Sequence, residues 1–119
     1  MVQKIQELSV FDKAHKFALK IYKFSSQFPK SELYGITSQI RRAATSVPAN
    51  IVEGNSRKSK KEFVQFLFTA KASLIEVNYF LLLSRDLEFI GNDIYERLIV
   101  ESDEIGKMIS GLLNYLSRI

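Results

Sequence analysis

Apolar residues recur every three or four positions along most of this 119-residue chain, and no segment alternates with the two-residue period of a β-strand. The clearest apolar stripe consists of Leu33, Ile36, Ile40, Ala44, Val47 and Ile51. Such spacing predicts an α-helix with one buried face. Pro48 falls inside this stripe, where it removes the hydrogen bond to the Ala44 carbonyl at a cost of about 3 kcal/mol. We therefore expect this helix to be bent at Pro48.

Start and stop signals divide the chain into four expected helices. Ser9 and Asp12 have the spacing of a capping box, and so do Ser59 and Glu62. Pro29, Gly54 and Gly91 mark the ends of the first three expected helices. The expected helices cover residues 9–28, 31 or 32–54, 59–87 and 91–118. Long helices with short links predict a single all-α domain, residues 1–119, folded as an antiparallel up-down-up-down four-helix bundle.

The third expected helix carries more apolar residues than a bundle core needs. One face suffices for the core, and it consists of Phe63, Leu67, Ala70, Leu74, Val77 and Leu81. Further apolar residues lie outside that face: Val64, Phe68, Ile75, Tyr79, Leu82 and Leu83. A wide core stripe would account for them. We favour an interface between subunits, because a helix that is apolar on two faces must bury both. The expected oligomer interface therefore includes Phe68 and Tyr79.

The composition argues against several classes of function. Cysteine is absent, which excludes disulfides, thiol nucleophiles and cysteine metal sites, and His15 is the only histidine. Neither a Gly-rich phosphate loop nor a G-x-S-x-G motif is present. We therefore expect no enzymatic activity, no cofactor and no metal. Residues 1–7 contain no apolar signal core, and Lys71 and Glu76 interrupt the most apolar run, so we expect a cytoplasmic protein that does not enter a membrane.

The net charge of +4 conceals a difference between the two halves of the chain. Residues 1–61 contain nine Lys and three Arg against four acids, a net charge of +8. Residues 62–119 contain five basic residues against nine acids, a net charge of −4. The basic half is therefore suited to bind a polyanion or to pair with the acidic half of its own chain.

Two groups of basic residues are candidate nucleic-acid contacts. The first, which we name the lysine ridge, consists of Lys13, Lys16, Lys20 and Lys23. Its steps of three, four and three residues place it along one side of the first helix. The second, which we name the basic link, consists of Arg57, Lys58, Lys60 and Lys61. Solubility alone would account for the ridge about as well, because rows of lysines are common on protein surfaces.

The two adjacent arginines, Arg41 and Arg42, are expected to have different roles. Arg42, Ser46, Asn50 and Glu53 follow one another at steps of four, four and three. We expect them to form a partly buried polar network in which Glu53 neutralises an arginine. Direct phosphate binding by the arginines is the alternative. Arg41 points away from this line and is a further candidate for nucleic-acid binding.

A long motif gives the chain a family resemblance. It reads Phe-Pro-x-x-Glu-x-Tyr-Gly at 28–35 and Ser-Gln-Ile-Arg-Arg-Ala-Ala-x-Ser-Val-Pro-Ala-Asn-Ile-x-Glu-Gly at 38–54. Phe-x-x-Phe-Leu-x-x-Ala at 63–70 and Ala-Ser-Leu-x-Glu at 72–76 continue it. Over roughly residues 7–116 the chain resembles the four-helix-bundle proteins encoded in intervening sequences of bacterial 23S rRNA genes. It departs from the usual family pattern at Ile36, Val52 and Ala72, where leucine, alanine and glycine are more common.

The resemblance implies a four-helix protomer that assembles into a homopentamer with a basic surface. The chain is also similar to the accessory protein of diversity-generating retroelements, which shares this bundle and associates with a reverse transcriptase and nucleic acid. We therefore predict a non-enzymatic, homopentameric protein that binds nucleic acid, with structured RNA such as rRNA favoured over DNA. The alternative is a structural scaffold or accessory protein that binds a protein partner through the oligomer surface.

Overall fold

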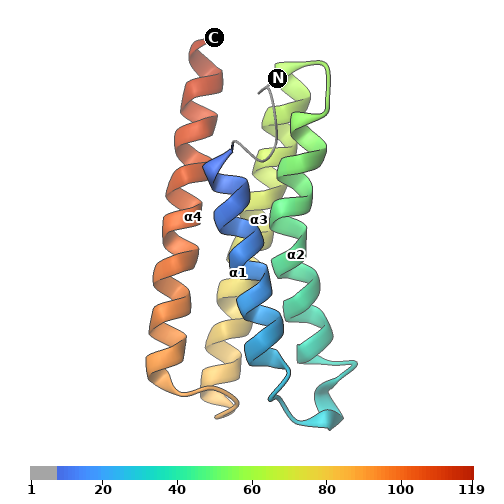
Figure 1. Ribbon diagram of the computed structural model, residues 1–119, viewed down its shortest axis with the longest axis vertical. Coiled ribbons are helices and arrows are strands. Elements are labelled where there is room, and N and C mark those ends of the chain that lie inside the picture. The colour runs from blue at the N-terminus through green and yellow to red at the C-terminus, as the bar shows by residue number, and fades with distance from the viewer. Residues whose placement is uncertain (1–7) are drawn as a thin grey trace.

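The computed structural model describes residues 8–119, which form an all-α bundle of four α-helices (Figure 1). These helices are α1 (Ser9–Ser25), α2 (Ile36–Asn55), α3 (Lys60–Asp86) and α4 (Asn92–Arg118), with a short 3₁₀-helix, η2 (Lys30–Glu32), between α1 and α2. The described part of the chain contains no strand, and the predicted all-α fold class is confirmed. Two predictions concern residues 1–7: that they contain no signal core, and that the domain begins at residue 1. Both lie outside the described residues.

The four helices surround one core. In Figure 1 the chain descends along α1, rises along α2, descends along α3 and rises along α4. Each helix contacts the next, and α1 also contacts α4, so the bundle closes on itself. The bundle measures 46 Å along its axis and 24 by 20 Å across. The α2–α3 connection and the end of α4 share one end of the bundle, which we call the link end (Figure 1).

The core consists largely of the helix faces predicted from the sequence. All six core positions predicted on α3 are buried, and the α2 stripe is buried from Ile36 to Ile51. Leu33 was expected in that stripe, but it precedes α2 and remains 49% exposed. On α1 the buried aromatic residue is Phe17, whereas Phe11 is only half-buried.

α3 is the one described helix that is long and apolar enough to cross a membrane, judged by length and composition alone. The bundle explains part of this apolar character, because seven α3 residues are buried among the other helices. Apolar residues of α3 outside the core face remain exposed: Phe68, Ile75 and Tyr79 are 53%, 62% and 57% exposed on the protomer.

α1 begins at Ser9, as predicted, but the predicted cap of α1 and the predicted start of α2 were wrong, and local hydrogen bonds show why. Leu8, not Ser9, precedes the first turn of α1, and no side chain caps that helix. The chain leaves α1 after Ser25, because residues 26–28 form a turn. Glu32 ends the 3₁₀ turn instead of starting α2, and its carboxylate accepts a hydrogen bond from the Ile36 backbone N–H (3.4 Å). α2 therefore begins at residue 36.

The predicted capping box at the start of α3 is present. The Ser59 hydroxyl accepts a hydrogen bond from the Glu62 backbone N–H (3.2 Å) and donates one to the Glu62 carboxylate (2.9 Å). These bonds satisfy part of the hydrogen-bonding need of the first turn, which has no partners within the helix. The α2–α3 connection, which carries the basic link, is therefore held at its α3 end by the Ser59 and Glu62 side chains.

α2 continues without interruption through Pro48, whose side chain is buried. One turn before the proline, the Thr45 hydroxyl donates hydrogen bonds to the carbonyls of Arg41 (2.9 Å) and Arg42 (3.2 Å). Hydroxyl groups that bond back to the preceding turn are one way in which helices accommodate a distortion. The bend expected at Pro48 stays a prediction.

Candidate nucleic-acid interface

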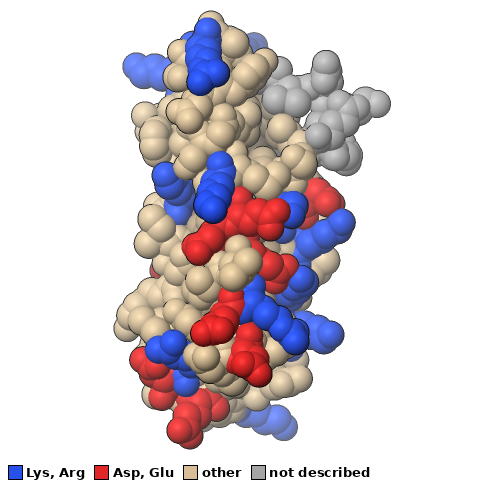
Figure 2. All heavy atoms as spheres, turned by 90° about the vertical axis from the view of Figure 1, so that its left-hand side faces the viewer, with Lys and Arg blue, Asp and Glu red and all other residues tan. Residues whose placement is uncertain are grey.

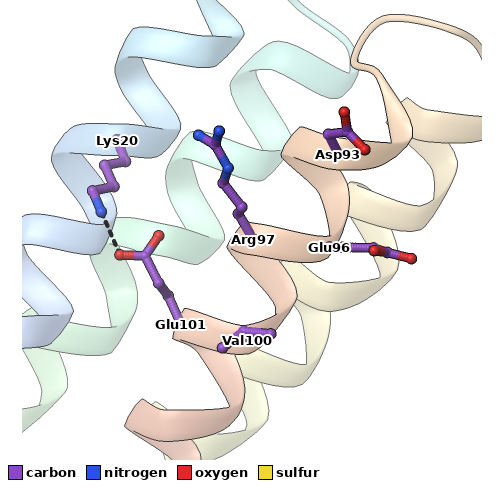
Figure 3. Close-up of a pocket in the computed structure, with 6 residues that line it drawn as sticks. All are labelled: Lys20, Asp93, Glu96, Arg97, Val100 and Glu101. Carbon is purple, nitrogen blue, oxygen red and sulfur yellow. Dashed lines mark hydrogen bonds and ion pairs between the residues drawn. The ribbon is translucent and has the colours of Figure 1, made fainter.

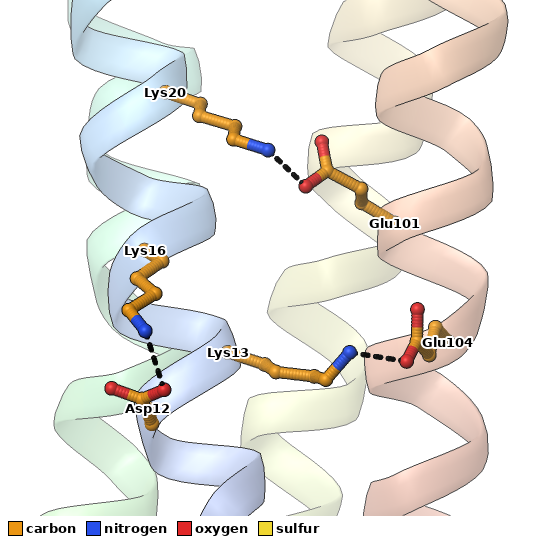
Figure 4. A network of polar contacts seen from close by, with 6 residues as sticks. All are labelled: Asp12, Lys13, Lys16, Lys20, Glu101 and Glu104. Atoms are coloured by element: carbon orange, nitrogen blue, oxygen red, sulfur yellow. Dashed lines mark hydrogen bonds and ion pairs between the residues drawn. The ribbon is translucent and has the colours of Figure 1, made fainter.

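Three of the four lysines in the lysine ridge are paired with acids (Figure 4). Lys13 forms an ion pair with Glu104, and Lys20 forms one with Glu101, so both reach across from α1 to α4. Lys16 pairs with Asp12 at 2.9 Å, one turn away on α1. Lys23 has no ion pair within residues 8–119. The acidic half of the chain therefore neutralises two of the four ridge lysines, and Asp12 of the basic half neutralises a third.

An anionic ligand can compete with the carboxylates for these lysines. The paired side chains of Lys13 and Glu104 are about half exposed, and Lys20 is similarly exposed. An exposed pair contributes no more than about 1 kcal/mol, because water screens the charges and two long side chains lose freedom. A phosphate group can replace the carboxylate, but its net binding free energy is less favourable at a paired lysine than at a free one.

The basic link lies at the link end of the bundle and is differently arranged. Lys58, Lys60 and Lys61 are exposed, and none of them pairs with an acid in the described part of the chain. Arg57 is fixed, since its Nη2 donates to Glu53 Oε1 (2.6 Å) and its guanidinium lies 4.9 Å from the centre of the Phe66 ring. The link thus combines three free ammonium groups with one positioned guanidinium.

The surface charge also differs between the middle of the bundle and the link end. Figure 2 shows the side of the bundle that includes α4, where acidic side chains gather over the middle and lower parts. In the upper part of this view, which is the link end, Lys and Arg appear without acidic neighbours. The last turn of α4 adds Arg118 at this end. The link end is therefore the basic pole of this face.

The structure assigns Arg41 a role opposite to the expected one. Its Nε donates to Ser25 Oγ (2.8 Å), its Nη2 donates to the Tyr22 carbonyl (3.3 Å), and its guanidinium lies 4.6 Å from the centre of the Tyr22 ring. Arg41 therefore connects α2 to α1. Arg42 is exposed, and its side chain forms no hydrogen bond or ion pair with any described residue. Arg42, not Arg41, is the free cation of the pair.

The predicted polar network is present only in its middle section. Asn50 Nδ2 donates to the Ser46 carbonyl (2.8 Å) and to Ser46 Oγ (2.9 Å), and Ser46 Oγ shares a hydrogen bond with Ser73 Oγ of α3 (2.7 Å). The assignment of Arg42 and Glu53 to this network was wrong. Glu53 is exposed and binds Arg57 four residues further on. Helical spacing on α2 shows which residues are neighbours, but the partner Ser73 comes from another helix.

The two arginines should respond differently to the same substitution. We expect Arg41→Gln to lower the free energy of unfolding by about 1–2 kcal/mol, because it removes two hydrogen bonds and a cation–π contact between α1 and α2. Arg42→Gln should change it by no more than about 0.5 kcal/mol, as is usual for exposed positions. Urea denaturation of both variants measures the difference. Equal stabilities would contradict the role assigned to Arg41.

A mixed-charge depression of about 600 Å³ lies between α1 and α4 (Figure 3). Its lining residues are Lys20, Asp93, Glu96, Arg97, Val100 and Glu101. Three acids and two basic groups line the depression, and Lys20 is already paired with Glu101, so this site does not favour a polyanion. Within the described residues, no group of three His, Cys, Asp or Glu side chains is placed to hold a metal ion.

The fold and its basic pole define a small all-α bundle protein with one candidate anion-binding end. The family model of the 23S rRNA-intervening sequence protein matches residues 6–111, and the chain belongs to this family. It is similar to the crystal structure of a protein of unknown function from the S23 ribosomal protein family of Bacteroides thetaiotaomicron, with 29% identity and a TM-score of 0.82. That match covers 88% of this chain and 95% of the other. No curated protein matches the chain. The resemblance found in the sequence is confirmed.

Proposed function

We propose that the protein is a non-enzymatic homo-oligomer that binds structured RNA, with rRNA as the first ligand to test, chiefly through the basic link. The observation that supports this most strongly is the presence of three exposed, unpaired lysines beside a positioned arginine at one end of the bundle. Lysine acts on phosphate as a mobile point charge that discriminates little between bases. Binding through this link is therefore governed by RNA shape and charge, not by base sequence.

The lysine ridge has a secondary part in this proposal. Lys13, Lys16 and Lys20 give up carboxylate partners when they contact phosphate, whereas Lys23 is free to bind at once. The ridge extends the RNA contact along the bundle once the link is engaged. Arg41 is left out, because its guanidinium is held against Tyr22 and Ser25.

The proposed assembly is a homopentamer in the cytoplasm, without membrane contact. The exposed apolar residues of α3 and the family resemblance both support an oligomer. Rotational symmetry repeats each surface feature on the same side of a ring, so five basic links would face the same way. Binding of one RNA by several links raises the overall affinity without any new kind of contact.

Titration of a labelled RNA hairpin between about 50 and 200 mM salt tests the RNA proposal. Each phosphate contact contributes roughly −0.7 to −0.9 to the slope of log K against log salt concentration. Three lysines at one engaged link should therefore give a slope of about −2 to −3, and several links a steeper one. A DNA hairpin of the same sequence is the control for the RNA preference. Absence of binding at low salt would rule out the nucleic-acid function.

A scaffold that binds a protein partner through the oligomer surface is the second candidate. The exposed apolar residues on α3 favour it, because such residues commonly mark interaction sites. In that case no RNA hairpin binds at any salt concentration. The salt titration therefore separates the two functions.

A further inference from the structure

The outer face of α3 carries a continuous apolar surface, which we name the α3 stripe. It consists of Phe68, Ala72, Ile75, Tyr79 and Leu82, all exposed on the protomer. Steps of four, three, four and three residues keep these side chains on one side of the helix. Lys71 does not interrupt the stripe, because its Nζ is directed to Ser110 Oγ on α4 (3.2 Å). Of the most apolar 18-residue window of α3, only 28% is buried inside the protomer.

A second apolar surface is a groove of about 270 Å³ between α1 and α2, which we name the α1–α2 groove. Its main apolar lining is Phe11, Leu19, Tyr22, Pro48 and Val52. Leu19, Tyr22 and Val52 are 57%, 44% and 39% exposed, so the groove is open to solvent. Arg41 holds the Tyr22 ring in place from α2. The groove is therefore already formed in the isolated protomer.

The stripe and the groove face different sides of the bundle. The groove belongs to α1 and α2, whereas Ile75 of the stripe also lines a depression between α3 and α4. The α1–α2 pair and the α3–α4 pair lie opposite one another in the closed bundle. A two-fold dimer that pairs stripe with stripe would leave the groove exposed, and one that pairs groove with groove would leave the stripe exposed. A single kind of contact covers both surfaces when the stripe of one copy packs into the groove of another.

The charges beside the two surfaces are complementary. Arg42 lies on the exposed side of α2, three residues before Thr45 of the groove, and has no ion pair among residues 8–119. Glu76 stands beside the stripe, one turn from both Ala72 and Tyr79, and is likewise exposed and unpaired. Docking of a stripe in a groove brings charges of opposite sign to the rim of the contact, where they orient the copies.

We propose that the α3 stripe of one copy packs into the α1–α2 groove of the next copy, head to tail. Every copy then gives its stripe to one neighbour and its groove to the other. Contacts of this kind close into a ring when the rotation between neighbours fits. The proposal rests on the homo-oligomer proposed above and adds to it the two surfaces that meet.

Two single variants, used alone and mixed, test the head-to-tail contact. Phe68→Asp damages the stripe and leaves the groove, whereas Leu19→Asp damages the groove and leaves the stripe. Each variant alone should be monomeric by native mass spectrometry and sedimentation velocity. A mixture retains one sound interface, between the stripe of the Leu19→Asp copy and the groove of the Phe68→Asp copy. It should therefore form a one-to-one heterodimer and nothing larger.

Val100→Asp is the matched control, because Val100 is an exposed apolar residue (65%) on α4 outside both surfaces. It should assemble as the unmodified protein does, and circular dichroism should show all three variants to be folded. An oligomer that persists in Leu19→Asp, or a mixture that stays monomeric, would overturn the stripe-in-groove contact. If the unmodified protein is itself monomeric at micromolar concentration, the homo-oligomer is refuted as well.

Because the chain has no cysteine, engineered cysteines provide a second test that does not depend on loss of assembly. The double variant Val52→Cys/Ile75→Cys places one thiol in the groove and one in the stripe. Under mild oxidation it should yield a ladder of covalent oligomers, whereas Ile75→Cys alone should yield none. A covalent dimer from Ile75→Cys alone would show that stripe packs against stripe and would overturn the proposal.

Discussion

Replacement of Lys58, Lys60 and Lys61 together by Gln is expected to weaken RNA binding about a hundredfold at about 0.1 M salt. If each lysine contacts one phosphate, the slope of log K against log salt concentration becomes shallower by about two units. We assume that both proteins have the same RNA affinity when it is extrapolated to about 1 M salt. A slope difference of two units then corresponds to a factor of about one hundred in affinity at 0.1 M. The loss should be the same for RNAs of unrelated sequence, since these contacts read charge and not bases.

The matched control is the replacement of Lys13, Lys16 and Lys20 by Gln. It removes the same three charges, so long-range attraction to RNA falls equally in both variants. These lysines are already paired with acids, and we expect a loss of less than about tenfold from their contacts. Equal losses in the two variants would show that net charge, not the basic link, governs binding.

Gly54→Ala is expected to destabilise the fold, even though alanine is the better helix former. An added Cβ at this position would lie 2.7 Å from Phe66 Cβ and 2.9 Å from Phe63 Cδ1. Phe66 Cβ is attached directly to the backbone and cannot rotate away, so α2 and α3 must move apart. We expect a net loss of about 1–2 kcal/mol in the free energy of unfolding, measured by urea denaturation.

Gly111→Ala is the control for this substitution. Gly111 also lies in a helix, but apart from its chain neighbours and the backbone of α4 itself no atom stands within 4 Å of an added Cβ. Here the gain in helix propensity, up to about 1 kcal/mol, should appear without a steric cost. A Gly54→Ala protein as stable as the unmodified one would show that α2 and α3 separate easily. The close approach at Gly54 would then not be what positions the basic link.

The positions of the helices and their buried faces were largely predictable. Each depends on the pattern within one segment, since apolar residues spaced three or four apart must share a face whatever that face packs against. This is why all six core positions of α3 were correct. The Ser59–Glu62 capping box was also correct, because both partners lie within one turn. The same pattern at Ser9 and Asp12 failed, because α1 begins directly after Leu8, before the serine can cap it.

The pairing of charges was decided only by the tertiary structure. Lys13 and Glu104 are 91 positions apart, and nothing in the lysine spacing shows that α4 presents Glu101 and Glu104 to the ridge. The two adjacent arginines differ for the same reason: Arg41 meets Tyr22 and Ser25 of α1, while Arg42 meets solvent. The sequence by itself determined the four helices and their core faces, because these follow from local periodicity. Which cations remain free to bind a ligand depends on which helices are neighbours, and only the packing of the bundle settles that.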